Sequence, residues 1–180
     1  SSTSIAMKDY GLENIVYELN YESAKIAKEV ASEFKEKKYV AGSIGPTNKT
    51  TSMSPDVNDP GFRAVSFDEL VDSYYEQVKG LVDGGSDILL VETVFDTLNA
   101  KAALMAISNY FEENEISLPI MVSGTITDNS GRTLSGQTVN AFLISLSHFP
   151  LLSIGFNCAL GADQLTPYMK RLSNSTNFFT

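Results

Sequence analysis

The chain of 180 residues contains one cysteine, one histidine, six prolines and no tryptophan. A single cysteine, Cys158, cannot form an internal disulfide, which fits a reducing compartment. No apolar run reaches the ~18 residues of a membrane span, and the serine-rich opening lacks the basic and then apolar layout of a signal peptide. We therefore expect a cytoplasmic protein with no membrane partner.

Positive charge is also scarce. The 13 lysines and arginines are outnumbered by 22 aspartates and glutamates, giving a formal net charge of −9. This balance argues against a phosphate-binding surface, so nucleic acid is not expected as a partner. With 43% hydrophobic and 19% charged residues, the composition is typical of soluble globular proteins. A chain of this length is enough for one domain that buries roughly 70% of its unfolded surface.

Short apolar runs, which predict buried strands, alternate with segments whose apolar residues recur every three or four positions, which predicts helices. The predicted strands are residues 39–45, 87–93, 118–126 and 151–158, and the predicted helices are residues 4–37, 67–83, 95–113, 137–147 and 163–173. Gly11 is a candidate break in the first helix. Ser66 and Glu69 have the spacing of a capping box. A polar loop is expected at residues 127–136, and residues 174–180 are expected to fray.

The predicted strands begin near residues 39, 87, 119 and 151, and a helix follows each of them. Strand–helix units that recur in this way are typical of a parallel α/β architecture. Four strands are visible, whereas a closed barrel needs eight. We therefore expect residues 1–180 to be a single partial (β/α)8 TIM barrel domain, made of the central βα units without the N-terminal and C-terminal strands.

Residues 47–66 form a long polar segment with two prolines after the first predicted strand. Loops of more than about 12–15 residues in a compact domain are usually functional or disordered. Asp56, Asn58 and Asp59 suggest a calcium loop, but the twelfth position is Phe67, where an EF-hand requires a glutamate. Turn formation and helix capping are the better interpretation of these residues.

Polar side chains cluster where the predicted strands end. Because the carboxyl ends of parallel strands meet at one edge, these side chains should converge on a common rim. The residues are Ser43, Thr47, Asn48, Glu92, Thr93, Asp96, Ser123, Thr125, Thr127, Asn157 and Cys158. Glu92 is costly to bury without a partner. It either holds a cationic group such as a substrate ammonium or makes a structural salt bridge or helix cap.

Cys158 follows the last predicted strand. A thiolate at that position is a nucleophile or a metal ligand, although a lone cysteine is more often a small buried hydrophobe. His148 lies ten residues earlier, which places it roughly 25–30 Å away at about 3.3 Å per residue and disfavours a Cys–His dyad. No glycine-rich phosphate loop follows any predicted strand, so nucleotide binding has little support.

Three long blocks carry a more specific signal: AGSIGPTNKTTSMSPDVNDPGFRAVSFDELVDSYYEQVKGLVDGGSDILLVETVFDTLNAKAA, LPIMVSGTITDNSGRTLSGQT and SIGFNCALGADQL. Together they resemble the homocysteine-binding barrel of cobalamin-dependent methionine synthase, and the likeness runs almost end to end. The related betaine-dependent enzymes share the strand that ends in Asn-Cys but not the GPTNKT…MSPDV and SGTITD…GRTLSGQT blocks.

The resemblance implies a zinc-thiolate mechanism. In that family three cysteines and the sulfur of homocysteine surround zinc, which activates the thiol towards the methyl group of methylcobalamin. That methyl group comes originally from methyltetrahydrofolate, and separate domains of the same chain bind folate and cobalamin. Cys158 matches the first zinc cysteine. Glu92 is the candidate for binding the homocysteine ammonium, with Thr93 and Asn157 beside it as substrate-binding neighbours.

The other two zinc cysteines of the family have no counterpart in this sequence. A single thiolate does not make a three-ligand zinc site, so we expect the 180 residues alone to bind zinc weakly and to transfer no methyl group. Two other interpretations stay open. One is a homocysteine methyltransferase that uses betaine or S-methylmethionine, and the other is a non-catalytic α/β module in which Cys158 is core and Glu92 an ion pair.

Overall fold

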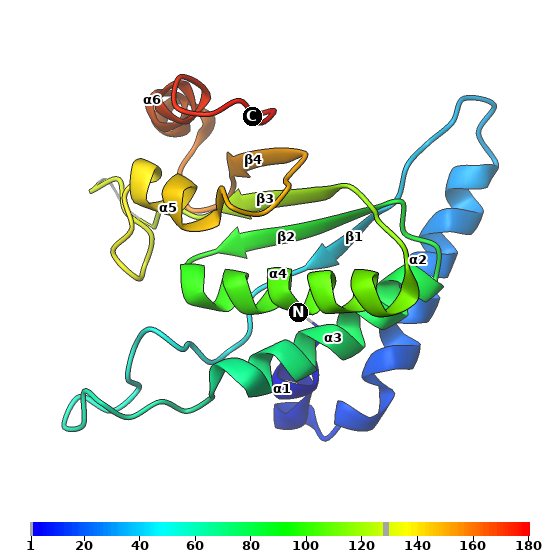
Figure 1. Cartoon of the computed structure of the whole chain (residues 1–180), viewed down its shortest axis with the longest axis horizontal. Coiled ribbons are helices and arrows are strands. Elements are labelled where there is room, and N and C mark those ends of the chain that lie inside the picture. The colour runs from blue at the N-terminus through cyan, green and yellow to red at the C-terminus, as the bar shows by residue number, and fades with distance from the viewer. Residues whose placement is uncertain (1, 128–129) are drawn as a thin grey trace.

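The computed structural model describes residues 2–127 and 130–180, and a parallel sheet lies at its centre. Its strands are β1 (Ala41–Ile44), β2 (Ile88–Val94), β3 (Ile120–Gly124) and β4 (Ser153–Phe156). They follow one another in the sheet in sequence order, and each neighbouring pair is parallel (Figure 1). The predicted parallel α/β architecture is confirmed, and the unbroken strand order is that of a barrel wall.

The helices are α1 (Ser4–Met7), α2 (Val16–Ser32), α3 (Phe67–Asp83), α4 (Thr97–Asn114), α5 (Val139–Leu146) and α6 (Ala162–Ser173). The helix predicted over residues 4–37 is interrupted near its candidate break and ends earlier than predicted. Gly11 adopts a left-handed conformation with φ of 67°, and two short 3-10 turns, Lys8–Tyr10 and Glu13–Ile15, separate α1 from α2. The expected break at Gly11 is therefore present, and α2 ends at Ser32.

The capping box predicted for α3 is present. The Ser66 side chain accepts a hydrogen bond from the Glu69 backbone N–H at 3.2 Å, and Glu69 accepts one from the Ser66 backbone N–H at 2.8 Å. This second bond is the main reason that the pKa of Glu69 lies below its usual value. Two of the unpaired N–H groups at the start of α3 are thus satisfied locally, which fixes where the long loop at residues 47–66 ends.

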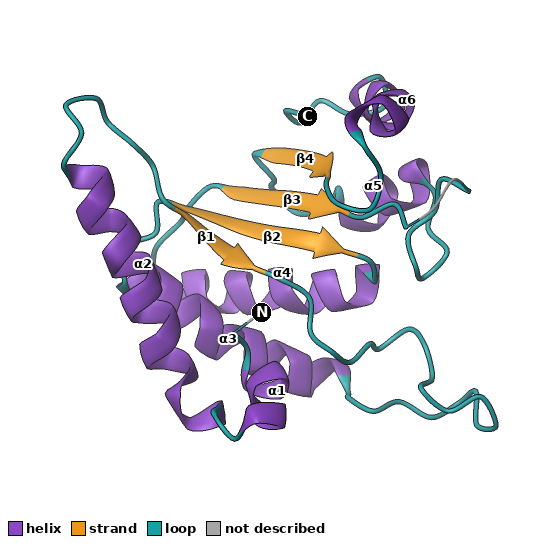
Figure 2. Cartoon of the chain, turned by 180° about the vertical axis from the view of Figure 1, so that it is seen from behind, coloured by secondary structure: helices purple, strands orange, loops and turns teal. Residues whose placement is uncertain are grey.

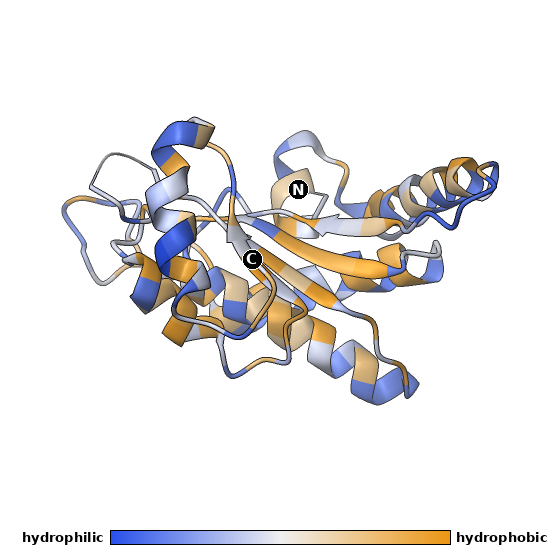
Figure 3. Cartoon of the chain, turned by 90° about the horizontal axis from the view of Figure 1, so that it is seen from above, coloured by the Kyte–Doolittle hydropathy of each residue, from blue (hydrophilic) through white to orange (hydrophobic). Residues whose placement is uncertain are grey.

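Helices cover one face of the sheet much more than the other (Figure 2). Along β2 the side chains of Leu89, Val91 and Val94 are buried in the hydrophobic core, whereas Ile88, Leu90 and Glu92 are only half-buried. The two longest strands are coloured mostly hydrophobic in Figure 3, whereas the short ones are paler. One face therefore packs on α3 and α4, and the other, which carries Glu92, stays more open. We call the second face the open face.

Residues 174–180 were expected to fray, but the end of the chain instead pairs with β4. The backbone N–H of Ile154 donates to the Phe179 carbonyl at 2.9 Å, and the Phe179 N–H donates to the Leu152 carbonyl at 3.3 Å. Phe179 thus forms a parallel bridge with Ser153, and Phe178 packs against the core. The outer edge of β4 presents N–H and C=O groups that need partners, and the tail supplies them.

Close packing and one carboxylate hold the first three long helices together. A Cβ atom built on Gly80 of α3 would lie 2.7 Å from the Tyr17 carbonyl oxygen in α2, so only glycine fits. The Asp83 carboxylate accepts hydrogen bonds from Tyr17 of α2 at 2.9 Å, from Lys79 at 2.5 Å and from Tyr110 of α4 at 2.7 Å. Partial burial opposes ionisation of Asp83, but the three donors outweigh it and lower its pKa.

We expect Asp83→Asn to reduce the free energy of unfolding by about 1 kcal/mol at pH 7, because the charge-assisted bonds go to a partly solvated carboxylate. Since folding lowers the Asp83 pKa, the stabilisation is complete above the unfolded value of about 3.9 and is lost as the pH falls through the folded value. Urea unfolding from pH 7 to pH 2 should show the gap between the two proteins narrowing below about pH 4. The exposed Asp72→Asn on the same helix is the control, and a pH-independent gap would contradict this account.

Candidate functional site

The carboxyl ends of the four strands meet on one side of the molecule, at the left in Figure 1. Six of the polar residues predicted for this edge form two hydrogen-bonded groups there, a pair and a set of four, which are joined because Glu92 and Thr93 are adjacent in β2. We call this group the rim site. Its members are Ser43, Glu92, Thr93, Ser123, Asn157 and Cys158.

An irregularity in β2 gives the rim site its shape. Val91 pairs with Val122, but the next pairing joins Val94 to Gly124, so β2 carries one extra residue opposite β3. Glu92 and Thr93 both lie within this bulge and both are half-buried. Thr93 has φ of 58°, in the left-handed region. A β-branched residue is a clear outlier there, and such strain costs on the order of 1–3 kcal/mol.

Glu92 has a partner on the neighbouring strand. The Ser43 hydroxyl of β1 donates a hydrogen bond to Glu92 Oε1. None of the ion pairs found among residues 2–127 and 130–180 includes Glu92. The carboxylate is therefore held in place by a neutral donor, and its negative charge stays available to a cationic group on the open face.

Asn157 connects three strand ends. Its Oδ1 accepts from the Thr93 backbone N–H at 3.3 Å and from the Ser123 hydroxyl at 2.8 Å. Its Nδ2 donates to Thr93 Oγ1 at 2.9 Å and to Cys158 Sγ at 3.1 Å. The predicted neighbours Glu92, Thr93, Asn157 and Cys158 are thus brought together, two of them within one bulge and three within one hydrogen-bonded set.

Cys158 is exposed, so it is not a small buried core residue. It follows the end of β4, and both Cys158 and Ala159 adopt left-handed conformations with φ of 60° and 52°. Two successive non-glycine residues in this region are uncommon and mark a tightly constrained turn. The turn directs the chain away from the sheet and into α6, leaving the thiol at the rim.

The thiol alone is not a metal centre. Among the described residues no group of three His, Cys, Asp or Glu side chains is placed to hold a metal ion. Cys158 offers one soft thiolate ligand of the kind that zinc prefers, but a three-ligand catalytic site needs donors besides those described. The donor set therefore does not fit a complete zinc site.

Other predicted residues serve the surrounding loops instead. Thr47 accepts from Asn99 at 3.2 Å, Asn48 donates to Asp9 at 2.5 Å, and Thr127 donates to a loop carbonyl at 3.2 Å. His148 is exposed in the turn before β4, at the opposite end of the strand from Cys158. This placement agrees with the sequence argument against a Cys–His dyad.

The acidic residues whose spacing resembles a calcium loop form turns, as predicted. Asp56 Oδ1 accepts from the Asn58 backbone N–H at 2.8 Å, and Asp59 Oδ1 accepts from the Gly61 N–H at 3.1 Å. Arg63 closes the same loop by donating to backbone carbonyls, including that of Thr51 at 2.8 Å. The long segment at residues 47–66 is thus an ordered loop held by its own side chains.

Sequence reasoning missed Asn99, which anchors this loop to α4. Its Oδ1 accepts from the Thr51 backbone N–H at 3.0 Å and its Nδ2 donates to the Lys49 carbonyl at 2.8 Å. Asp96 was predicted as a rim residue, and it accepts from the Ser52 hydroxyl at 2.6 Å while capping α4. No local pattern identifies Asn99, because its partners lie about fifty positions earlier in the chain.

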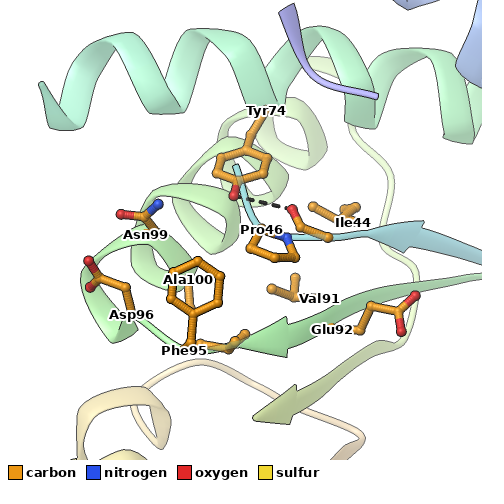
Figure 4. A pocket seen from close by; sticks show the side chains of 11 residues that line it. Ile44, Pro46, Tyr74, Val91, Glu92, Phe95, Asp96, Asn99 and Ala100 are labelled. Carbon is orange, nitrogen blue, oxygen red and sulfur yellow. Dashed lines mark hydrogen bonds between the residues drawn. The ribbon is translucent and has the colours of Figure 1, made fainter. Parts of the chain in front are cut away.

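A small pocket lies between these anchors and the rim site, with Asp96 and Asn99 at one end and Glu92 at the other (Figure 4). Tyr74 forms part of its wall and donates to the Gly45 carbonyl at 3.3 Å. Burial raises the pKa of Tyr74, so its hydroxyl stays protonated at neutral pH. The pocket therefore lies between the side chains that anchor the loop at residues 47–66 and the strand end that carries Glu92.

The four parallel strands alternating with helices form part of a (β/α)8 barrel domain, with polar side chains at the ends of its strands. Among solved structures, the homocysteine methyltransferase MmuM from Escherichia coli is similar in its metallated form at TM-score 0.73 and 20% identity, covering 97% of this chain and 60% of that one. Its oxidised form gives TM-score 0.72 over the same shares, and its apo form gives 0.68 over 89% and 56%. The chain thus spans somewhat over half the length of the structures it matches.

The sequence profile described as homocysteine S-methyltransferase matches residues 1–179. The chain therefore belongs to the homocysteine S-methyltransferase family, and its four strands form part of that family's TIM-barrel domain.

The strain at Thr93 gives a test of the bulge. At an ordinary strand position glycine is less stable than alanine by roughly 0.5–1 kcal/mol. At position 93 we expect the reverse, with Thr93→Gly more stable than Thr93→Ala by about 1 kcal/mol, because only glycine adopts a positive φ without strain. Urea unfolding of the two variants measures the difference.

The same pair of substitutions at Thr97, in the first turn of α4, is the control. There alanine should be the more stable residue. If alanine is also the more stable residue at position 93, Thr93 is not held in the left-handed conformation in solution.

Proposed function

We propose that this chain is the homocysteine-binding part of a cobalamin-dependent methionine synthase. The observation that carries the proposal is the rim site, where an available carboxylate on β2 and an exposed thiol just after β4 stand at the same edge of one sheet in a chain of this family. The three sequence blocks that resemble methionine synthase support this assignment over other members of the family. Residues 1–180 would form one partial barrel domain, with further strands completing it.

In this proposal Glu92 binds the ammonium group of homocysteine. Its carboxylate is oriented by Ser43 and faces the open side of the sheet, so a charge-assisted hydrogen bond forms without displacing another cation. Thr93 lies next to it in the bulge. Its hydroxyl accepts from Asn157 and keeps its own proton for an oxygen of the substrate.

Cys158 would contribute one thiolate to a zinc site, and the other two cysteine ligands would come from outside this sequence. When bound, zinc lowers the pKa of a thiol so that it becomes a nucleophile near neutral pH. Methylcobalamin would supply the methyl group, and the folate- and cobalamin-binding domains of the same chain would be the partners.

The alternative is a homocysteine methyltransferase with betaine or S-methylmethionine as the methyl donor. The similarity to MmuM, a homocysteine methyltransferase by name, keeps this alternative open. It uses the same homocysteine site, so Glu92 and Cys158 have the same roles in both. None of the helices among residues 2–127 and 130–180 has the length and apolar character of a membrane span. From membership of this family we propose that the protein acts in the cytoplasm.

Calorimetric titration of the chain with two ligands tests the role of Glu92. L-Homocysteine and 4-mercaptobutanoate differ only in the ammonium group, so the wild-type chain should bind homocysteine about tenfold more tightly, a gap of about 1.4 kcal/mol. Glu92→Gln should remove this preference, because the neutral amide does not attract the ammonium. The exposed Glu112→Gln is the control and should keep it. Equal preference in the wild type and Glu92→Gln would overturn the assignment.

A further inference from the structure

We infer that Asn157 is a positioning residue for the Cys158 sulfur, and that Ser123 in turn fixes the orientation of Asn157. The inference deepens the proposed function and rests on it, because a sulfur held in one place matters only if Cys158 binds a metal. It also gives Asn157 a different role from the substrate contact expected from the sequence.

The first step is a count of hydrogen bonds. A side-chain amide has two N–H donors and an oxygen with two lone pairs. In Asn157 both donors are used, by Thr93 Oγ1 at 2.9 Å and Cys158 Sγ at 3.1 Å. Both acceptor positions are used as well, by the Thr93 N–H at 3.3 Å and the Ser123 hydroxyl at 2.8 Å. The amide is saturated, so binding a substrate through it would first break one of these bonds.

The second step concerns which way the amide faces. A backbone N–H only donates, so the atom of Asn157 that faces the Thr93 N–H is the oxygen. The Ser123 hydroxyl adds a second bond on the same oxygen. If the amide were flipped, its NH₂ group would face the Thr93 N–H, and the oxygen would face the sulfur. Ser123 and Thr93 together therefore direct the NH₂ group to Cys158.

The third step links the amide to the strained backbone on both sides. Thr93 and Cys158 are both left-handed, with φ of 58° and 60°. Asn157 bonds to two atoms of Thr93 and to the side chain of Cys158, so it holds the two strained turns relative to each other. Fixed partners of this kind orient metal ligands and reduce the entropy lost when the metal binds.

Nitrogen-15 NMR of the labelled chain tests the inference without any metal. The two Nδ2 protons of Asn157 are assigned by their absence in Asn157→Asp. In Cys158→Ala we expect one of these protons to shift while its partner, bound to Thr93, stays in place. Ser123→Ala should shift both and speed their exchange with water several-fold. Ser123→Thr, which keeps the hydroxyl, should restore the wild-type signals.

Ser153→Ala is the matched control, since it removes a half-buried serine hydroxyl from the neighbouring strand β4. It should leave both Asn157 protons unchanged. The inference is overturned if Cys158→Ala shifts neither proton, or if Ser153→Ala has the same effect as Ser123→Ala, because Asn157 would then be a general structural contact.

Homocysteine titration of the same samples separates the two proposals. If the Asn157 protons respond to the Cys158 and Ser123 variants as expected but homocysteine does not bind, the proposed function is overturned and the hydrogen-bond assignment is supported. Homocysteine binding that depends on Glu92, with Asn157 signals that ignore Cys158 and Ser123, would overturn the positioning role and support the proposed function.

Discussion

The extra residue in β2 is the constraint on which the rest of the rim depends. Regular pairing would place Glu92 and Thr93 on opposite faces of the sheet, since successive side chains of a strand alternate. The bulge turns both away from the buried core, at the point where Thr93 enters the left-handed region. From there the Thr93 N–H donates to Asn157, the residue just after β4, and the Thr93 hydroxyl oxygen accepts from the same side chain. A local backbone distortion is thereby used to join strands that are not neighbours.

Much of the framework could be predicted because it follows from local patterns. The apolar runs predicted four parallel strands, and the spacing of Ser66 and Glu69 predicted a capping box. The polar residues at the strand ends predicted a common rim that contains Glu92, Asn157 and Cys158. These signals lie within a few residues of the structure they specify. The residues that carry the family resemblance and the polar residues at the strand ends therefore lie at the same edge of the sheet.

Features that depend on distant partners could not be predicted. Threonine favours extended conformations, so nothing near Thr93 indicates a bulge, and the conformation is maintained by Asn157, 64 positions later. Asn99 and the loop it anchors are separated by about fifty positions, and Phe179 pairs with β4 because that edge has free backbone groups. In each case the sequence shows ordinary residues, and their roles arise only when the strands are assembled.

The open face has a consequence for how the Glu92 charge acts. While water covers that face, the field of the carboxylate is screened by a medium of high dielectric constant, and attraction to an ammonium at 4 Å is worth about 1 kcal/mol. Covering the face would replace water with protein of lower effective dielectric constant and strengthen the same attraction about fourfold. If Glu92 binds an ammonium as proposed, the strength of that binding would therefore depend on what lies over the sheet as well as on Glu92 itself.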